Sequence, residues 1–361
     1  MENVELSFCI PTYNRSLSVS RLVKDILLCA DPNIEVIVLD NGSTDDTLNI
    51  LSGIEDERLF VYSNGENKGA LFNMINVINK GTGKFIVYST DQDYIDYTKI
   101  DDFKSFLLRH AGDLAGGFCE FSAQSVGQNE IIPKGYQAVK KIAYQGRHPT
   151  GYFFNNKLLK SIKFVERFSD YNRVGLFPLE FAFAELCLLG DGAIYHKTIF
   201  SPETGSMVVK HKSSTTNGNF KNSFFSPEAR LKSAVSYTNH VNSLRLFPKE
   251  RGLLIINIFL REMMAATLGY RGILRSEDLC THYYMESRDI KTLELLTIGL
   301  NFHKKFVSET AGVWGDGFIN KSRFYILLLS RLFHKVINKL VAITMRLYNI
   351  SKAKNNDEIK E

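Results

Sequence analysis

The stretch GKFIVYSTDQDYI, residues 83–95, ends a short apolar run on two carboxylates, Asp91 and Asp93. Such a run, bounded by polar residues, is typical of a strand buried on both faces of a sheet. Two carboxylates one residue apart at the end of a strand can present oxygens to one divalent cation, together with substrate phosphates. The stretch therefore predicts a metal-assisted diphosphate site, and a solvated Asp-rich turn is the alternative.

Three similar runs precede this one, and helix-like segments separate them. Ser43 is a suitable N-cap for the second helix, and Gly81 closes the third. This alternation predicts a parallel sheet with flanking helices. The expected strands are residues 6–10, 35–39, 59–63 and 85–89, and the expected helices are residues 17–30, 44–51 and 70–80.

A polar, turn-rich segment follows each expected strand. In parallel sheets, ligands bind outside the carboxyl ends of the strands, because that edge collects loops and helix N-termini. Carboxylates from the second and fourth strands are therefore expected to face one site. The four segments are Pro11-Thr12-Tyr13-Asn14, Asp40-Asn41-Gly42-Ser43, Asn64-Gly65-Glu66-Asn67 and Asp91-Gln92-Asp93.

The second half of the chain has a mixed pattern and then a helical one. Strands are expected at residues 114–121 and 193–198, and a helix at residues 178–189. Residues 202–227 are rich in Ser, Thr, Asn and Gly, which predicts a mobile loop or linker that closes over the site. The predicted organisation is a catalytic α/β domain over residues 1–201, this linker, and a mainly helical region over residues 228–361.

Composition excludes several classes of protein. With 44% hydrophobic and 23% charged residues, the 361-residue chain is expected to be globular. Five scattered cysteines without a CxxC pair favour a reducing, cytoplasmic compartment over a disulfide or zinc framework. We see no secretory signal, and the longest uncharged apolar run, residues 252–260, is too short to span a membrane. Any membrane contact is expected to be peripheral.

Four segments in order resemble the family 2 glycosyltransferases of the GT-A fold, an α/β fold of Rossmann type. They are SFCIPTYNR (7–15), VIVLDNGSTDDT (36–47), NGENKGALFN (64–73) and GKFIVYSTDQDYI (83–95). The chain departs from the family pattern at Asn41, where a second aspartate is commoner, and at Tyr94, where a further aspartate is frequent. The resemblance covers residues 6–95 and implies a nucleotide-sugar transferase.

The resemblance also implies roles for single residues. Asp93, with Asp91, would bind the divalent cation, Mn²⁺ or Mg²⁺, and Asp91 would also face the ribose. The residues expected to hold the nucleoside are Pro11, Thr12, Tyr13, Asn14 and Asp40, and those expected to line the donor pocket are Asn67, Gly69 and Asn73.

An inverting transferase needs a base to deprotonate the acceptor hydroxyl. The segment FPLEFAFAELCLLGDGAIYH, residues 177–196, resembles the family region that supplies it, and Glu180 is the candidate base. Phe181 follows it where an aspartate is expected, and Glu185 or Asp191 are alternatives. The histidines His148 and His196 are expected to be structural rather than ligands.

The expected reaction moves a sugar from a nucleotide diphosphate donor, UDP-linked, to a hydroxyl of a surface glycan such as capsule, O-antigen or lipooligosaccharide. The acceptor is expected to be lipid-linked, and nucleic acid is not an expected partner. A sugar nucleotidyltransferase is one alternative, but it would need a Gly-rich basic loop where this chain has PTYNR, residues 11–15. A non-catalytic protein that binds nucleotide sugars or glycans is the other alternative.

The C-terminal tail is basic. No acidic residue lies between Asp316 and Asp357, and residues 326–347 place Arg331, Lys335 and Lys339 at near-helical spacing among apolar residues. This pattern is typical of an amphipathic helix on an anionic membrane surface, here the inner face of the plasma membrane. A helix packed on the catalytic domain with a solvated basic face is the alternative.

Overall fold

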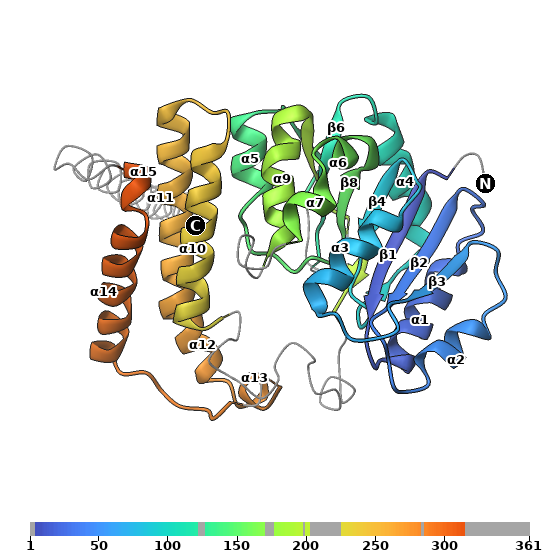
Figure 1. The fold of residues 1–361 in the computed structure, drawn as a ribbon, viewed down its shortest axis with the longest axis horizontal. Coiled ribbons are helices and arrows are strands. Elements are labelled where there is room, and N and C mark those ends of the chain that lie inside the picture. The colour runs from blue at the N-terminus through green and yellow to red at the C-terminus, as the bar shows by residue number, and fades with distance from the viewer. Residues whose placement is uncertain are drawn as a thin grey trace, which may run out of the picture.

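The structure is a computed structural model, and it describes residues 4–121, 127–169, 177–197, 199–202, 225–282 and 285–314. Figure 1 shows a sheet with helices on both of its faces and, beside it, a group of long helices from the second half of the chain. The predicted order of an α/β region followed by a helical region is confirmed for these residues.

The first half of the sheet forms as predicted. Strands β3, β2, β1 and β4 lie side by side in that order, and all of their pairings are parallel. Strands β1, β2 and β4 are almost entirely buried, as their uninterrupted apolar runs require. Their bounds are β1 Leu6–Thr12, β2 Ile34–Asp40, β3 Leu59–Ser63 and β4 Phe85–Tyr88, and the helices between them are α1 Ser16–Leu27, α2 Thr47–Ser52 and α3 Ala70–Lys80.

One predicted helix start is wrong. Ser43 does not cap α2, which begins at Thr47 after Asp46. The Ser43 hydroxyl instead accepts a hydrogen bond from the backbone N–H of Asn14, at 2.8 Å, and its own N–H donates to Asp40. These bonds hold Ser43 in the turn after β2, so the helix starts later.

The second half of the sheet contains an antiparallel insertion that the sequence did not reveal. Strand β8 (Tyr152–Asn155) lies between β4 and β6 and is antiparallel to both. The full order is β3-β2-β1-β4-β8-β6-β9-β7, and a separate pair joins β5 to β10. The remaining strands are β5 Tyr94–Ile95, β6 Leu114–Cys119, β7 Glu130–Ile132, β9 Asp191–Tyr195 and β10 Phe200–Ser201.

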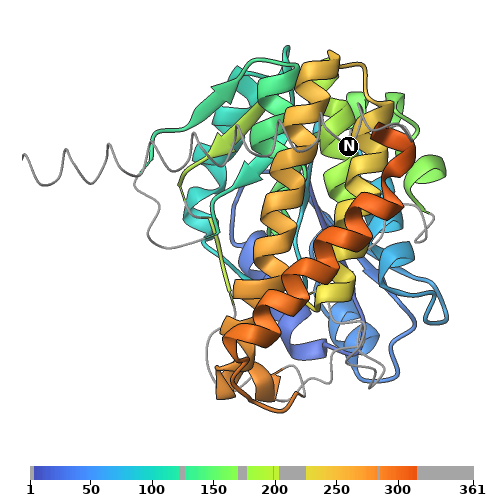
Figure 2. The ribbon, with the colours of Figure 1, turned by 90° about the vertical axis from the view of Figure 1, so that its left-hand side faces the viewer.

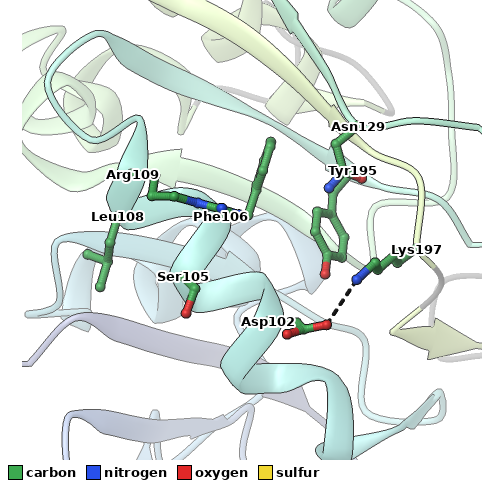
Figure 3. A pocket seen from close by; sticks show the side chains of 8 residues that line it. All are labelled: Asp102, Ser105, Phe106, Leu108, Arg109, Asn129, Tyr195 and Lys197. Atoms are coloured by element: carbon green, nitrogen blue, oxygen red, sulfur yellow. Dashed lines mark hydrogen bonds and ion pairs between the residues drawn. The ribbon is translucent and has the colours of Figure 1, made fainter.

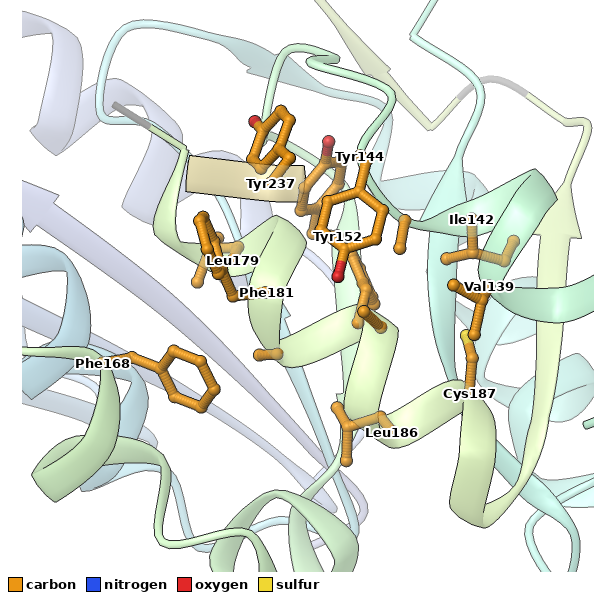
Figure 4. Close-up of a cluster of buried hydrophobic side chains, with 14 of the residues drawn as sticks. Val139, Ile142, Tyr144, Tyr152, Phe168, Leu179, Phe181, Leu186, Cys187 and Tyr237 are labelled. Carbon is orange, nitrogen blue, oxygen red and sulfur yellow. The ribbon is translucent and has the colours of Figure 1, made fainter. Parts of the chain in front are cut away.

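The sheet separates two hydrophobic clusters. One lies under α1, α2 and α4. The other lies under α3, α5 and α9 and continues into two long helices, α10 (Pro227–Ser243) and α11 (Pro248–Met264). Figure 4 shows part of the second cluster, in which Tyr237 of α10 lies near Tyr144 and Phe181. The further elements of this part are η1 Tyr97–Lys99, α4 Ile100–Arg109, α5 Tyr136–Ile142, α6 Asn156–Ser161, α7 Phe164–Phe168 and α9 Pro178–Leu189.

The C-terminal helices share this core with the sheet. His240 of α10 contacts the Tyr144 hydroxyl at 2.7 Å and the carboxylate of Glu185 on α9 at 3.0 Å. Figure 2 shows α14 crossing the outer side of α10 and α11. The bounds are α10 Pro227–Ser243, α11 Pro248–Met264, η4 Ala265–Gly269, α12 Tyr270–Leu274, α13 Glu277–His282, α14 Thr292–Glu309 and α15 Ala311–Trp314.

The helix of α11, η4 and α12 is continuous over Pro248–Leu274 and, by length and composition alone, could cross a membrane. The apolar run in the sequence is shorter, because Arg261 and Glu262 interrupt it. Half of the most apolar window of this helix is buried inside the structure. We therefore interpret it as a core helix of the C-terminal region.

Two predictions fall mainly outside the described residues. They are the basic amphipathic helix at residues 326–347 and most of the loop at residues 202–227. The proposed domain limits at residues 201 and 228 stay predictions.

Candidate functional site

The carboxyl ends of β1 and β4 meet at Asp91, as predicted. The Thr12 hydroxyl donates to Oδ2 of Asp91 at 2.8 Å, and Nη1 of Arg15 pairs with its Oδ1 at 3.1 Å. Burial raises the pKa of Asp91, and Arg15 and the Thr12 hydroxyl oppose this shift. The buried carboxylate is thus held in a fixed orientation beside the first turn.

Asp93 is also buried, and two threonine hydroxyls fix it. Thr90 and Thr150 both donate to its Oδ2 atom. Nδ1 of His148 lies 3.7 Å from the same oxygen, and its ring stacks on Phe121 with a centroid distance of 4.5 Å. Burial lowers the pKa of His148, so the imidazole is neutral near pH 7. A neutral imidazole beside a carboxylate is a suitable pair of metal ligands.

The turn between these carboxylates is clamped by a second arginine. Nη2 of Arg21, on α1, donates to the backbone oxygen of Gln92 at 2.8 Å. Its guanidinium also lies over the ring of Tyr94, 3.7 Å from the centroid. Tyr94, which departs from the family pattern, therefore packs against the arginine that holds the turn.

Asp40 shapes the turn that follows β2. Its fully buried carboxylate accepts hydrogen bonds from the N–H groups of Gly42 and Ser43 and from the Ser63 hydroxyl, at 3.0 to 3.2 Å. Asn14 joins this turn, because its side-chain oxygen accepts from the N–H of Thr44 at 2.7 Å. The predicted nucleoside residues of the first two strands are thus brought together.

An asparagine network connects this turn to β3 and α3. Asn41 bonds to Asn67 at 2.8 Å, and Asn64 bonds to both Asn41 and Asn73 at 3.0 Å. The Asn73 side chain also donates to the backbone oxygens of Leu39 and Thr12. The Asn67 side chain accepts a hydrogen bond from the N–H of Gly69. Gly69 is the N-cap residue of α3 and has a φ of 90°. Pro11 and Tyr13 are half-buried beside the network.

These residues can hold a divalent cation only if the protein supplies few of its ligands. Asp93 and His148 are close enough to bind one cation, with Asp91 nearby. No group of three or more metal-binding side chains occurs in the part of the chain that the structure describes. Magnesium sites for nucleotides use one or two carboxylates and complete the shell with phosphates. The residues therefore suit a cation that binds together with a diphosphate.

Glu180, the candidate base, is buried at the start of α9. Its carboxylate accepts hydrogen bonds from the N–H groups of Gln145 and Gly146, at 3.0 and 2.9 Å, and from the Tyr152 hydroxyl at 2.9 Å. Burial raises the pKa of Glu180. The carboxylate thus holds the segment that leads to His148 and Thr150, the partners of Asp93.

The alternative residues lie elsewhere. Glu185 bonds to Arg167 and His240 and joins α9 to α10. Asp191 begins β9, which runs parallel to β6 and hence to β4, so it lies at the opposite edge of the sheet from Asp93. His196 lies 3.4 Å from Glu130, near strand β7.

The sequence did not reveal that Arg15 and Thr150 contact the two carboxylates. His148 was expected to be structural. Arg15 could have been found, because it is the one cation in the first turn, PTYNR. Thr150 and His148 follow Asp93 by more than 50 residues and have no motif that marks them. Their position depends on β8, the strand that was not predicted.

A separate cavity of about 640 Å³ lies between α4 and the end of β9 (Figure 3). Lys197 and Asp102 pair there at 2.9 Å. The lining residues are Asp102, Ser105, Phe106, Leu108, Arg109, Asn129, Tyr195 and Lys197. None of these lining residues belongs to the predicted donor site.

Comparison with known proteins gives the same picture of the first half of the chain. Residues 7–162 match the family model described as Glycosyl transferase family 2. The UDP-Glc:alpha-D-GlcNAc-diphosphoundecaprenol beta-1,3-glucosyltransferase WfaP of Escherichia coli is 31% identical over 102 residues, which cover 28% of this chain and 41% of WfaP. WfgD of Escherichia coli, which has the same activity in its name, is 26% identical over 161 residues, 45% of this chain and 57% of WfgD. The chain thus matches less than two thirds of either relative.

A third relative and one solved structure extend the comparison. The GalNAc(5)-diNAcBac-PP-undecaprenol beta-1,3-glucosyltransferase of Campylobacter jejuni is 29% identical over 92 residues, 25% of this chain and 30% of that protein. The crystal structure of Staphylococcus aureus TarS 1–349 superposes with a TM-score of 0.51 and 15% identity, over 87% of this chain and 93% of that chain. This likeness concerns the fold alone, and it confirms the predicted GT-A type.

Proposed function

We propose that this protein, whose residues 7–162 match the glycosyl transferase family 2 model, transfers a sugar, with inversion, from a nucleotide diphosphate donor to a glycan hydroxyl. The observation that supports it most is the buried pair of Asp91 and Asp93 at the carboxyl edge of β4, each held by threonine hydroxyls. Buried carboxylates occur in proteins where they are paired, hydrogen-bonded or bound to a metal, and a pair of them at a ligand-binding edge is a candidate functional site. Here the bound groups are a cation and a diphosphate.

The donor is UDP-linked in this proposal. Thr12, Asn14, Asp40 and Asn73 hold the nucleoside end, since they form one connected network at the ends of β1 and β2. The similar proteins WfaP and WfgD have UDP-Glc in their names, which supports uridine. Arg15 pairs with Asp91 at the ribose side and opposes the rise in its pKa that burial causes.

In this proposal, the diphosphate of the donor binds at Asp93. Asp93 and His148, with Asp91, would hold Mn²⁺ or Mg²⁺ there, and the cation would neutralise charge on the departing diphosphate. Thr90 and Thr150 orient the Asp93 carboxylate, so its geometry is set before the donor binds.

In the transfer step, the acceptor oxygen bonds to the anomeric carbon while the bond from that carbon to the diphosphate oxygen breaks. The acceptor proton passes to a base, and Glu180 is the proposed base. Burial raises its pKa, which makes the carboxylate a stronger base than an exposed one. Its contacts with Gln145 and Gly146 link it to the loop that contains His148. The same loop therefore connects the proposed base with the proposed donor site.

The acceptor in this proposal is a lipid-linked surface glycan, and the enzyme works at the cytoplasmic membrane surface. The relatives from Escherichia coli and Campylobacter jejuni have undecaprenol-linked acceptors in their names. On the outer side of α14, three leucines at helical spacing are exposed: Leu293, Leu296 and Leu300. Such an exposed apolar row is suited to a membrane surface.

Replacing Glu180 with Gln tests the reaction. We expect the rate of glucose transfer from UDP-glucose to a lipid-linked GlcNAc diphosphate to fall by about 10² to 10⁴, because a general base contributes that much. UDP affinity should stay unchanged. Glu185→Gln, on the same helix, is the matched control and should keep the wild-type rate at pH 7.

Two results would count against this assignment. An equal loss of UDP affinity in Glu180→Gln would make Glu180 a positioning residue for the donor loop. UDP binding by the wild type without transfer or donor hydrolysis would favour the non-catalytic alternative.

A further inference from the structure

Three arginines from three parts of the chain converge on the loop at residues 145–148. Arg147 lies in the loop itself, Arg230 lies on α10 and Arg261 on α11. Nη1 of Arg261 donates to the side-chain oxygen of Gln145 at 3.2 Å. A Cβ atom placed on Gly146 would lie 3.4 Å from Nη1 of Arg230. The guanidinium groups therefore surround one short stretch of backbone.

Two of these guanidinium groups have buried N–H groups without a hydrogen-bond acceptor in the part of the chain that the structure describes. They are Nη1 of Arg147 and Nη2 of Arg261. The Arg147 guanidinium lies over the ring of Phe118, 3.7 Å from the ring centroid. This contact with the face of the ring provides no acceptor for the N–H groups at the edge of the guanidinium. Buried donors are nearly always satisfied in native proteins, and an unpaired one commonly marks the place of an ion or water.

The neighbouring carboxylates do not meet this need. Glu262 contacts Arg230 and Arg261, each at 3.3 Å. Glu180 is bonded to two backbone N–H groups and to Tyr152. Glu120 also interacts with Arg147 through its charge. In the described part of the chain, these three carboxylates leave the two buried N–H donors unused. An anion with several oxygens would satisfy both, because guanidinium groups bind phosphate through parallel hydrogen bonds.

The position of the arginines distinguishes them from the donor site. In the sheet order, the proposed nucleoside residues lie at β1, β2 and β3, and Asp93 follows β4. Arg147 precedes β8, on the other side of β4, and Arg261 reaches it from α11. A donor that runs from β2 to β4 would have its sugar toward β8. The arginines therefore lie on the side from which an acceptor must approach.

We propose that Arg147 and Arg261 form a phosphate-binding subsite for the acceptor, which they hold by the phosphate groups that join its glycan to a carrier. This inference rests on the proposed function, since it assumes that the donor occupies the β1–β4 edge. The same chemistry would also bind the diphosphate of the leaving nucleotide, so the test must separate the two sources.

The probe is inorganic pyrophosphate, titrated into the full chain at saturating UDP with free Mg²⁺ held constant. Calorimetry should show pyrophosphate binding to UDP-loaded wild type. In Arg261→Gln that affinity should fall roughly tenfold to a hundredfold, as expected for lost charge-assisted hydrogen bonds. UDP affinity should not change. Arg147→Gln should show the same loss of pyrophosphate affinity. Two variants with the same result make misfolding of one of them an insufficient explanation.

Arg251→Gln is the matched control, because Arg251 lies on the same helix and donates to the backbone oxygen of Asn242 at 2.9 Å. It should bind pyrophosphate as the wild type does. No pyrophosphate binding to the UDP-loaded wild type would overturn the subsite. So would a parallel loss of UDP affinity in Arg261→Gln, since the arginines would then serve the donor. Failure of the wild type to bind UDP would overturn the proposed function, and the subsite with it.

Discussion

Asp40 and Asp91 show how single residues prepare this site. Both carboxylates are buried, and both accept hydrogen bonds from short side chains or backbone N–H groups at the ends of neighbouring strands. Such bonds compensate for the loss of water, which would otherwise cost several kcal/mol for a buried charge. These bonds orient both carboxylates before any ligand binds. The turn after β2 also contains a glycine with positive φ, Gly42.

Gly42 and Gly65 allow a matched test of this turn. Both have positive φ, 75° and 73°, but a Cβ on Gly42 would lie 2.6 Å from the backbone of Glu66, whereas nothing lies within 4 Å of one on Gly65. Gly65→Ala should lower the free energy of unfolding by about 1 to 2 kcal/mol, from backbone strain alone. Gly42→Ala should cost roughly 1 to 3 kcal/mol more, from the clash. Urea unfolding measures both, and equal losses would contradict the geometry.

Residues within the four motifs could be predicted, and their distant partners could not. Thr12, Asp91 and Asp93 follow strands that can be recognised from local apolar runs. Thr150 reaches Asp93 across 57 residues, and Arg261 reaches Gln145 across 116 residues. One sequence gives no signal for such contacts, because they depend on how whole elements pack.

At the scale of elements, periodicity predicted α3, α9 and β3 with their observed bounds. Strand β8 was missed because YFFN, residues 152–155, is short and leads directly into α6. Its antiparallel pairing with β4 and β6 is a long-range property. This strand matters for function, since the loop before it supplies His148 and Thr150.

The contact between α9 and α10 predicts a pH dependence of stability. Burial alone would raise the pKa of Glu185, but hydrogen bonds from His240 and Arg167 outweigh it, so its pKa is lowered from 4.5. A depressed carboxyl pKa stabilises the fold above about pH 4.5 and loses this effect as pH falls through the folded value. Glu185→Gln should therefore lower stability at pH 7 and reduce the further loss between pH 5 and pH 3.

Urea unfolding at several pH values measures this difference. Glu57→Gln, at an exposed glutamate in the turn before β3, is the control and should follow the wild-type curve. If the Glu185→Gln and wild-type curves ran parallel down to acid pH, the contact with His240 and Arg167 would not stabilise the fold.

The outer side of α14 predicts membrane binding. Each leucine that enters a bilayer surface contributes up to roughly 1.5 to 3 kcal/mol. The double replacement Leu296→Glu and Leu300→Glu should therefore weaken binding to anionic vesicles at least about tenfold. Leu17→Glu, at an exposed leucine of α1, should bind as the wild type does. Cosedimentation measures binding, and a change in oligomeric state without loss of vesicle binding would identify this face as a contact between copies.

At the scale of the whole molecule, the sheet order arranges the proposed reaction along one edge. The proposed nucleoside residues lie at β1 to β3, Asp93 lies after β4, and the proposed arginine subsite lies toward β8 and the C-terminal helices. The sequence predicted the α/β half and the helical character of the rest, because both depend on local patterns. It did not predict the contact between α11 and the loop before β8, since Arg261 reaches Gln145 from the C-terminal helices.

The most direct test of the central claim is a thermal-shift measurement with UDP, GDP, CDP and dTDP, with and without Mn²⁺, on the wild type and Asp93→Asn. A nucleotide at 100 times its Kd should stabilise the fold by about 2.7 kcal/mol. We predict a Mn²⁺-dependent shift with UDP that Asp93→Asn abolishes. No shift with any nucleotide, or the same shift in Asp93→Asn, would contradict the assignment of a metal-assisted donor site to Asp93.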